Sequence, residues 1–240
     1  MKKKLLLFLI PAAVYILLSA AGFGVTGTAG GLVYRIMIIA ALLYACSRAF
    51  AGAAREGGDR IRLTGALGLG TFAVNEIFLL AYIYLLKGAP SDITIGNYSR
   101  NCAYLFFMAV VLSLIESPAK RMPRIRISMF SFAATAVILY AVIANNSRFL
   151  YYSTLALVIL CVLPTIRLLS QSYKIQKLKP VRIFAYSILA VSVLDSLNRL
   201  LIIYSPGWYW RDIILAFYPT VYLMIGFSLT ALRKEAADNG

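Results

Sequence analysis

Long apolar runs dominate this sequence, and they restrict its fold more than any other feature. A helix that crosses a bilayer needs about 20 mostly apolar residues. Runs of this kind lie at 5–25, 31–50, 64–86, 102–117, 127–145, 149–169, 183–205 and 213–232. They are continuous and do not alternate between apolar and polar residues, so they predict helices and not the strands of a barrel. The sequence therefore predicts an all-α, polytopic membrane helical bundle with eight transmembrane helices.

The composition agrees with a chain that has the bilayer as its solvent. Of the 240 residues, 61% are hydrophobic and 14% are charged. A soluble globule with a mostly polar surface has far more charge than this. Because the apolar runs occupy nearly the whole chain, residues 1–240 are predicted to form a single transmembrane domain.

The net charge of +15 invites a nucleic-acid interpretation, but the positions of the basic residues argue for membrane topology. They concentrate at the amino terminus and in alternate connections. These residues are Lys2, Lys3, Lys4, Arg48, Arg55, Arg60, Arg62, Lys120, Arg121, Arg124, Arg126, Arg167, Lys174, Lys177, Lys179, Arg182, Arg233 and Lys234. By the positive-inside rule, both termini lie in the cytoplasm, with the chain in an inner or plasma membrane. Membrane lipids are the expected partners and nucleic acid is not.

The first apolar run has a second possible interpretation. Lysines before an apolar stretch and small residues at 19–21 also resemble a cleavable signal peptide. The stretch continues through Val25, which is longer than the about 7 to 15 residues usual in a signal sequence. We therefore expect an uncleaved first helix. Cleavage would leave seven helices.

The two halves of the chain show weak similarity to one another. Leu32-Val33-Tyr34 recurs as Leu150-Tyr151-Tyr152, and Asn75 aligns with Asp195. These matches predict two tandem four-helix units, 1–118 and 119–240. Since each unit has an even number of helices, the two units have the same orientation, in contrast to the inverted repeats of many transporters.

Two acidic residues lie deep inside predicted spans, where a charge costs several kcal/mol and usually has a function or a partner. Glu76 and Asp195 each lie twelve residues into their spans, about 18 Å from the end at a rise of about 1.5 Å per residue. Asn75 precedes Glu76, and Asn198 follows Asp195 by one turn. These groups are predicted to form one polar site near the midplane for a small ligand or ion. Alternatively, Arg199 neutralises Asp195 within its helix.

Two arginines are predicted at the outer face. Arg100 and Arg211 lie near the amino ends of the fourth and eighth spans, where unpaired backbone N–H groups favour anions. A negatively charged ligand could bind there.

Several other chemistries are disfavoured by the residues that the chain offers. There is no histidine, and the three cysteines are scattered, so no catalytic residue, metal site or cofactor is assigned. The glycines of 65–70 look like part of a phosphate loop, but they lie at the start of a span and predict close helix packing. Pro164 and Pro219 are predicted to kink their spans.

One segment resembles a known family. The run Asp212-Ile213-Ile214-Leu215-Ala216-Phe217-Tyr218-Pro219, followed by an apolar run with Gly226, is similar to a helix in multi-pass membrane input modules of bacterial sensor kinases and diguanylate cyclases. A weaker echo runs from Asn101 through Tyr104 to Phe107. The resemblance implies a sensing module whose last helix signals to a cytoplasmic output. The sequence ends at Gly240, so we expect an isolated input domain or a module with a signalling partner.

Three classes of function remain open at this point. The first is a ligand- or membrane-sensing module with a polar site near the midplane. The second is a small-solute or ion transporter that uses Glu76 and Asp195. The third is an intramembrane lipid enzyme that depends on the same two carboxylates.

Overall fold

Helices account for almost all of the chain that the structure describes. The structure is a computed structural model, and it describes residues 10–17, 21, 28–55, 59–85, 95–115, 147–174, 179–204 and 213–232. The helices are α2 (Thr28–Arg55), α3 (Arg60–Leu80), η1 (Ala81–Leu85), α4 (Ile95–Ile115), α6 (Ser147–Lys174), α7 (Lys179–Tyr204) and α9 (Tyr218–Ala231). Residues 10–17 are also helical, and these described ranges contain no strand.

Six helical segments of the described chain are long and apolar enough to cross a membrane. They are Gly31–Arg55, Arg60–Leu85, Tyr98–Ile115, Ala156–Tyr173, Lys179–Asn198 and Ile213–Ala231. The all-helical, membrane-embedded character predicted from the sequence is therefore supported. The predicted count of eight is not confirmed, because most of the first span and all of the fifth lie outside the described residues.

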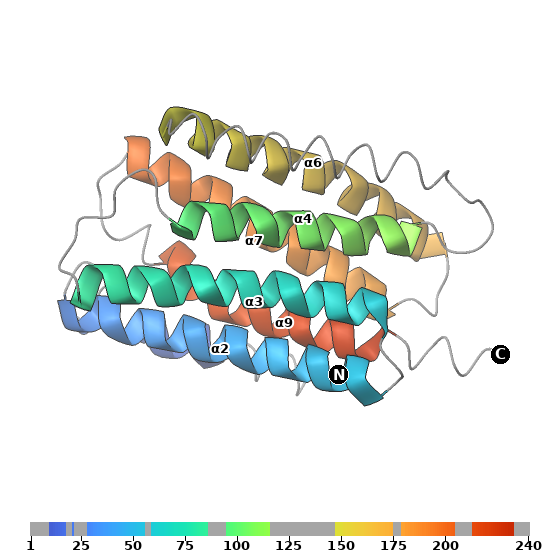
Figure 1. Cartoon of the computed structure of the whole chain (residues 1–240), viewed down its shortest axis with the longest axis horizontal. Helices are drawn as coiled ribbons and strands as arrows, with labels where there is room; N and C mark the ends of the chain where they lie inside the picture. Colours follow the sequence, from blue (N-terminus) through green and yellow to red (C-terminus); the bar gives the residue numbers. More distant parts are fainter. Residues whose placement is uncertain are drawn as a thin grey trace.

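The six long helices form a closed ring in the order of the chain. Successive helices contact one another from α2 through α3, α4, α6 and α7 to α9, and α9 returns to α2. Across the ring, α3 also contacts α9 and α4 contacts α7. In Figure 1, α6 and α2 lie at opposite edges, with α4 and α7 in one intermediate layer and α3 and α9 in the other. The centre of the bundle is therefore bounded by α3, α4, α7 and α9.

The last helix has a break near its start. Residues 213–216 are helical, Phe217 is a turn, and α9 begins at Tyr218 with a proline in its first turn. Proline is tolerated there because the first N–H groups of a helix have no partner within the helix. The kink predicted at Pro219 is thus a break that sets the position of Tyr218. Pro164, by contrast, lies inside α6.

The glycines of 65–70 lie inside α3, as the packing interpretation predicted. A Cβ atom added at Gly65 would lie 2.6 Å from Leu229 of α9, and one at Gly68 would lie 2.9 Å from Phe107 of α4. Glycine therefore allows two neighbouring helices to approach α3 closely.

Candidate functional site

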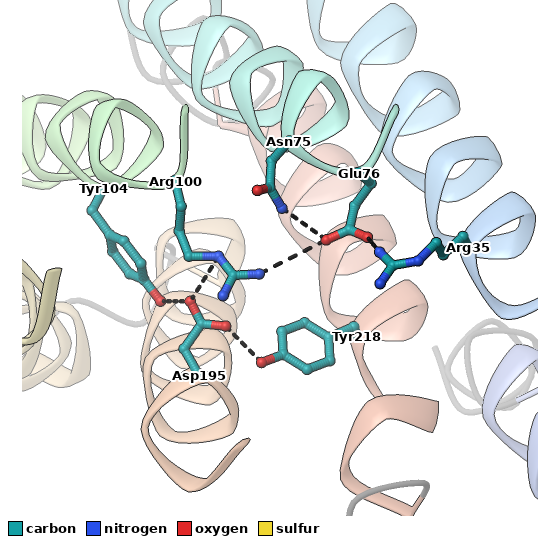
Figure 2. A network of polar contacts seen from close by, with 7 residues as sticks. All are labelled: Arg35, Asn75, Glu76, Arg100, Tyr104, Asp195 and Tyr218. Carbon is teal, nitrogen blue, oxygen red and sulfur yellow. Dashed lines mark hydrogen bonds and ion pairs between the residues drawn. The ribbon is translucent and has the colours of Figure 1, made fainter. Parts of the chain in front are cut away.

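A polar network at the centre of the bundle joins residues from five helices (Figure 2). It contains both predicted acids, Glu76 on α3 and Asp195 on α7. Each is the seventeenth residue of a helical segment that is 26 residues long, Arg60–Leu85 for Glu76 and Lys179–Tyr204 for Asp195. The two acids thus lie at matching depth, beyond the middle of their helices and toward the end of the bundle where α2 and α4 begin.

Glu76 is buried and has three polar neighbours. Arg35 Nη1 from α2 donates to its Oε2 at 2.9 Å, and Asn75 Nδ2 donates to its Oε1 at 2.9 Å. Arg100 Nη2 from α4 lies 3.8 Å from Oε1. The sequence showed no basic residue one turn away on the same helix, but neighbouring helices provide two.

Asp195 is fully buried and is held from two other helices. The hydroxyl of Tyr104 on α4 donates to Oδ2 at 2.7 Å, and the hydroxyl of Tyr218 on α9 donates to Oδ1 at 2.6 Å. Arg100 Nε lies 3.8 Å from Oδ2. The carboxylate therefore has a donor on each oxygen, which reduces the cost of burying its charge.

Arg100 connects the two acids. Figure 2 shows its guanidinium between Glu76 and Asp195, at ion-pair distance from both. Its Nε is buried and makes no hydrogen bond within the described part of the chain. Since one guanidinium reaches both carboxylates, the two acids belong to a single cluster. The guanidinium has not formed the bidentate contact that arginine usually makes with a carboxylate.

Counted over the described residues, the network is electrically balanced. Arg35 and Arg100 supply two positive charges, and Glu76 and Asp195 supply two negative charges. Opposite charges in a medium of low dielectric constant attract strongly, but each has lost its hydration. Such a cluster persists only while its pairs remain intact, so a change at one member affects the others.

Aromatic rings close off the network on the side of the bundle core. Phe72 lies 5.8 Å from the Tyr104 ring and 5.2 Å from the Tyr222 ring, measured between centroids. Tyr222 in turn lies 5.8 Å from Tyr218. All of these rings are buried. They separate the charged groups from the rest of the core and fix the two tyrosines that donate to Asp195.

The remaining predicted site residues have mixed outcomes. Asn198 is buried one turn after Asp195, but its Oδ1 has no hydrogen-bond partner among the described residues. Arg211 and the side chain of Arg199 lie outside the described residues, so the predicted pair between Arg199 and Asp195 remains a prediction. Arg100, which the sequence offered as a place where a negatively charged ligand could bind, lies at ion-pair distance from both acids, and the ligand remains a prediction.

Sequence reasoning did not assign Arg35, Tyr104 and Tyr218 to the site. Arg35 is a charge within an apolar run, and the rule that pointed to Glu76 could have found it. Tyr104 and Tyr218 both belong to the segments whose resemblance to sensor input modules remains a prediction. Their hydroxyls could not be assigned to Asp195, because that contact depends on how α4 and α9 pack against α7.

The donor set argues against a resident metal ion at this place. Within the described ranges, no three histidine, cysteine or acidic side chains converge. The two acids that do converge are occupied by arginine and tyrosine donors. The chemistry that the arrangement supports is exchange of hydrogen bonds and ion pairs between helices.

Comparison with protein-family models, with curated proteins and with solved structures found no match to this chain. The class of protein defined by the fold is therefore the coarse one: a helical protein whose apolar helices are compatible with an integral membrane protein.

Proposed function

We propose that this chain is a membrane-embedded sensing module, in which a small ligand or a state of the membrane acts on the network around Arg100. The observation that carries the proposal is the position of that guanidinium, 3.8 Å from a carboxylate on α3 and 3.8 Å from one on α7. A small displacement toward either acid would shorten one pair and lengthen the other. A ligand can shift a protein from one arrangement to another when the two arrangements have similar energies.

The balance of charge supports sensing over cation transport. An empty cation site would leave carboxylate charge uncompensated inside the membrane, whereas both acids here already have arginine partners. The same pairing argues against a carboxylate-dependent enzyme, since a general acid or base must be able to reach its substrate.

Tyr218 gives the network an output. Its hydroxyl ties the start of α9 to Asp195 on α7, and the helix, which is 14 residues long, then continues to Ala231. Tyr218 and Pro219 belong to the segment that resembles the signalling helix of bacterial input modules. We propose that breaking or remaking this bond moves α9, and that a cytoplasmic partner or output domain detects the movement.

We also propose that the complete bundle has eight spans in two parallel units. The helix contacts support it: exchanging α2 with α6, α3 with α7 and α4 with α9 turns every contact of the ring, and both contacts across it, into another observed contact. Glu76 and Asp195 also take equivalent places in α3 and α7. The bias of basic residues supports cytoplasmic termini in an inner or plasma membrane.

Distances between spin labels in nanodiscs test the sensing proposal. Labels at the exposed residues Ser170 on α6 and Phe227 on α9 report the position of α9, in a background without the native cysteines. We expect Asp195→Asn and Tyr218→Phe to redistribute this distance between two populations, and Ser113→Ala, at an exposed serine of α4, to leave it unchanged. Identical distributions in all variants would refute a mobile α9.

Transport is the second candidate function, and the accessibility of the two arginine side chains of the network favours it. The side chains of Arg35 and Arg100 are 17% and 16% exposed, against 8% and 0% for Glu76 and Asp195. The network thus has an accessible cationic side. Ion and proton flux in proteoliposomes separates the candidates. Sensing predicts no flux above that of empty liposomes, whereas flux that Glu76→Gln abolishes would establish transport.

A further inference from the structure

A second feature lies on the outside of the bundle, along the seam between α6 and α7, which contact one another. A groove of about 260 Å³ runs there. Its lining includes Ile159, Val162 and Leu163 of α6, and Ser192, Val193 and Leu197 of α7. Most of these apolar side chains are exposed on the bundle surface, and the small Ser192 makes room between them. None of them belongs to the central network.

The same seam ends in a polar and aromatic cluster. The hydroxyls of Tyr173 on α6 and Tyr186 on α7 are hydrogen-bonded to each other, and the Arg182 guanidinium carbon lies 5.3 Å from the centroid of the Tyr173 ring. Tyr173 and Tyr186 are 56% and 46% exposed, and Lys179, the first residue of α7, is also exposed. The contact with the ring holds the arginine in a fixed orientation.

The cluster and the groove lie on one continuous stripe of each helix. On α7, Arg182, Tyr186, Val193 and Leu197 follow one another at spacings of four, seven and four residues, which keeps them on one helix face. On α6, Tyr173, Ile166, Val162 and Ile159 are spaced by seven, four and three residues in the same way. The groove therefore begins about 10 Å from the tyrosine pair, at a rise of about 1.5 Å per residue.

These dimensions match a phospholipid. A lipid tail covers half of a hydrocarbon core that is about 30 Å thick, so a tail whose headgroup lies at the tyrosine pair would reach the groove. The stretch from the last residue of α6 to the first turn of α7 is also among the most basic in the sequence, with Lys174, Lys177, Lys179 and Arg182. The positive-inside rule predicts this end at the cytoplasmic leaflet, where anionic lipids are attracted to basic residues.

We infer that the α6–α7 seam is a binding site for one anionic phospholipid. Its phosphate pairs with Arg182 and Lys179 and accepts a hydrogen bond from the hydroxyl of the Tyr173–Tyr186 pair that does not donate to the other, and one acyl tail fills the groove. This site is separate from the proposed sensing network and does not depend on it.

Native mass spectrometry of the detergent-purified protein tests this inference, with phosphatidylglycerol and phosphatidylcholine of identical tails as probes. We expect tighter binding of phosphatidylglycerol. Arg182→Gln should weaken that binding about fivefold, the usual contribution of one basic residue at an anionic surface, and should leave phosphatidylcholine unchanged. Val193→Trp, which fills the groove, should weaken the binding of both lipids. Arg60→Gln, at an exposed arginine of α3, serves as the matched control.

Three results would overturn the inference. Equal affinity for the two lipids would show that the site does not recognise the headgroup. Full binding in Val193→Trp would show that the acyl tail does not lie in the groove. Competition by free glycerol phosphate at the same concentration as the lipid would show that a soluble phosphate is bound. Circular dichroism of each variant shows whether loss of binding comes from unfolding. An Arg182→Lys variant that retains selectivity would further support a charge contact.

Discussion

Arg100 is the residue of the network whose loss we expect to change the stability of the protein most. Removing one partner from a buried ion pair leaves the other charge without compensation, which costs more than the pair itself contributes. Arg100 is the only described cation within 4 Å of Asp195, and it also reaches Glu76. Among the described acids, Arg35 pairs with Glu76. The loss of Arg100 therefore leaves two acids with one arginine.

We predict that Arg100→Gln lowers the free energy of unfolding by about 3 to 5 kcal/mol, as expected when a buried ion pair loses one member. Reversible unfolding in mixed micelles provides the measurement. Arg48→Gln, at an exposed arginine of α2, is the control and should change it little. Equal stability of Arg100→Gln and Arg48→Gln would mean that the guanidinium does not compensate the two acids.

The tyrosines at Asp195 give a second prediction at this scale. Tyr218→Phe removes one hydrogen bond to a buried carboxylate and keeps the ring, so it should destabilise the protein by about 1.5 to 3 kcal/mol. Tyr104→Phe should have a similar effect, because Tyr104 donates to the other oxygen. The same unfolding assay applies, with Tyr44→Phe as the control. A loss below about 0.5 kcal/mol in both variants would show that the two hydroxyls do not stabilise the buried Asp195 side chain.

At the scale of elements, α2 and α9 approach each other most closely at Gly226. A Cβ atom added there would lie 2.6 Å from Ala45 Cβ and 2.7 Å from Ala45 Cα. Backbone cannot move aside as a side chain can, so the two helices would have to separate. This contact holds α9, the proposed output helix, against α2, which carries Arg35.

We predict that Gly226→Ala destabilises the protein by about 1 to 3 kcal/mol through overpacking, despite the higher helix propensity of alanine. Gly70→Ala is the matched control, because its nearest neighbour would be Cys46 Sγ at an ordinary 3.7 Å. It should be neutral or slightly stabilising. Thermal unfolding of the two variants compares them directly, and a stabilised Gly226→Ala would contradict the close approach of α2 and α9.

The sequence predicts the elements better than their contacts. Apolar runs at 64–86 and 183–205 correspond to helical segments at 60–85 and 179–204, because the length of a membrane-spanning helix is set by the bilayer. Matching depth for Glu76 and Asp195 follows from the same regularity. The hydrogen-bond and ion-pair partners of these two acids do not follow from it. That Arg35, Arg100 and Tyr104 point at these acids depends on the rotation of each helix, which a nearly uniform apolar helix does not encode in its pattern.

At the scale of the whole molecule, the ring of helices places the charged network between two ends that differ in charge. The bias of basic residues predicts the end near residues 56–58 and 175–178 in the cytoplasm, and the end near 88–94 outside. The network lies nearer the second end. An external ligand would therefore have the shorter path to Arg100.

We predict that single cysteines at Gly57→Cys and Lys177→Cys resist a membrane-impermeant maleimide in intact cells, whereas Ser91→Cys is labelled. Background labelling is removed by replacing the native cysteines, and permeabilised cells show that every site can react. Labelling of Gly57→Cys before permeabilisation would reverse the predicted topology and place the network nearer the cytoplasm.

The central claim is that Glu76 and Asp195 belong to one network through Arg100, and a double-mutant cycle of unfolding free energies tests it most directly. Glu76→Gln and Asp195→Asn each leave one acid for the shared arginine, but the double variant leaves Arg35 and Arg100 with no acid in the network. We therefore predict that the double variant is less stable than the sum of the single effects by about 1 kcal/mol or more. Additive effects, within about 0.5 kcal/mol, would show that the two acids act independently and would contradict the account.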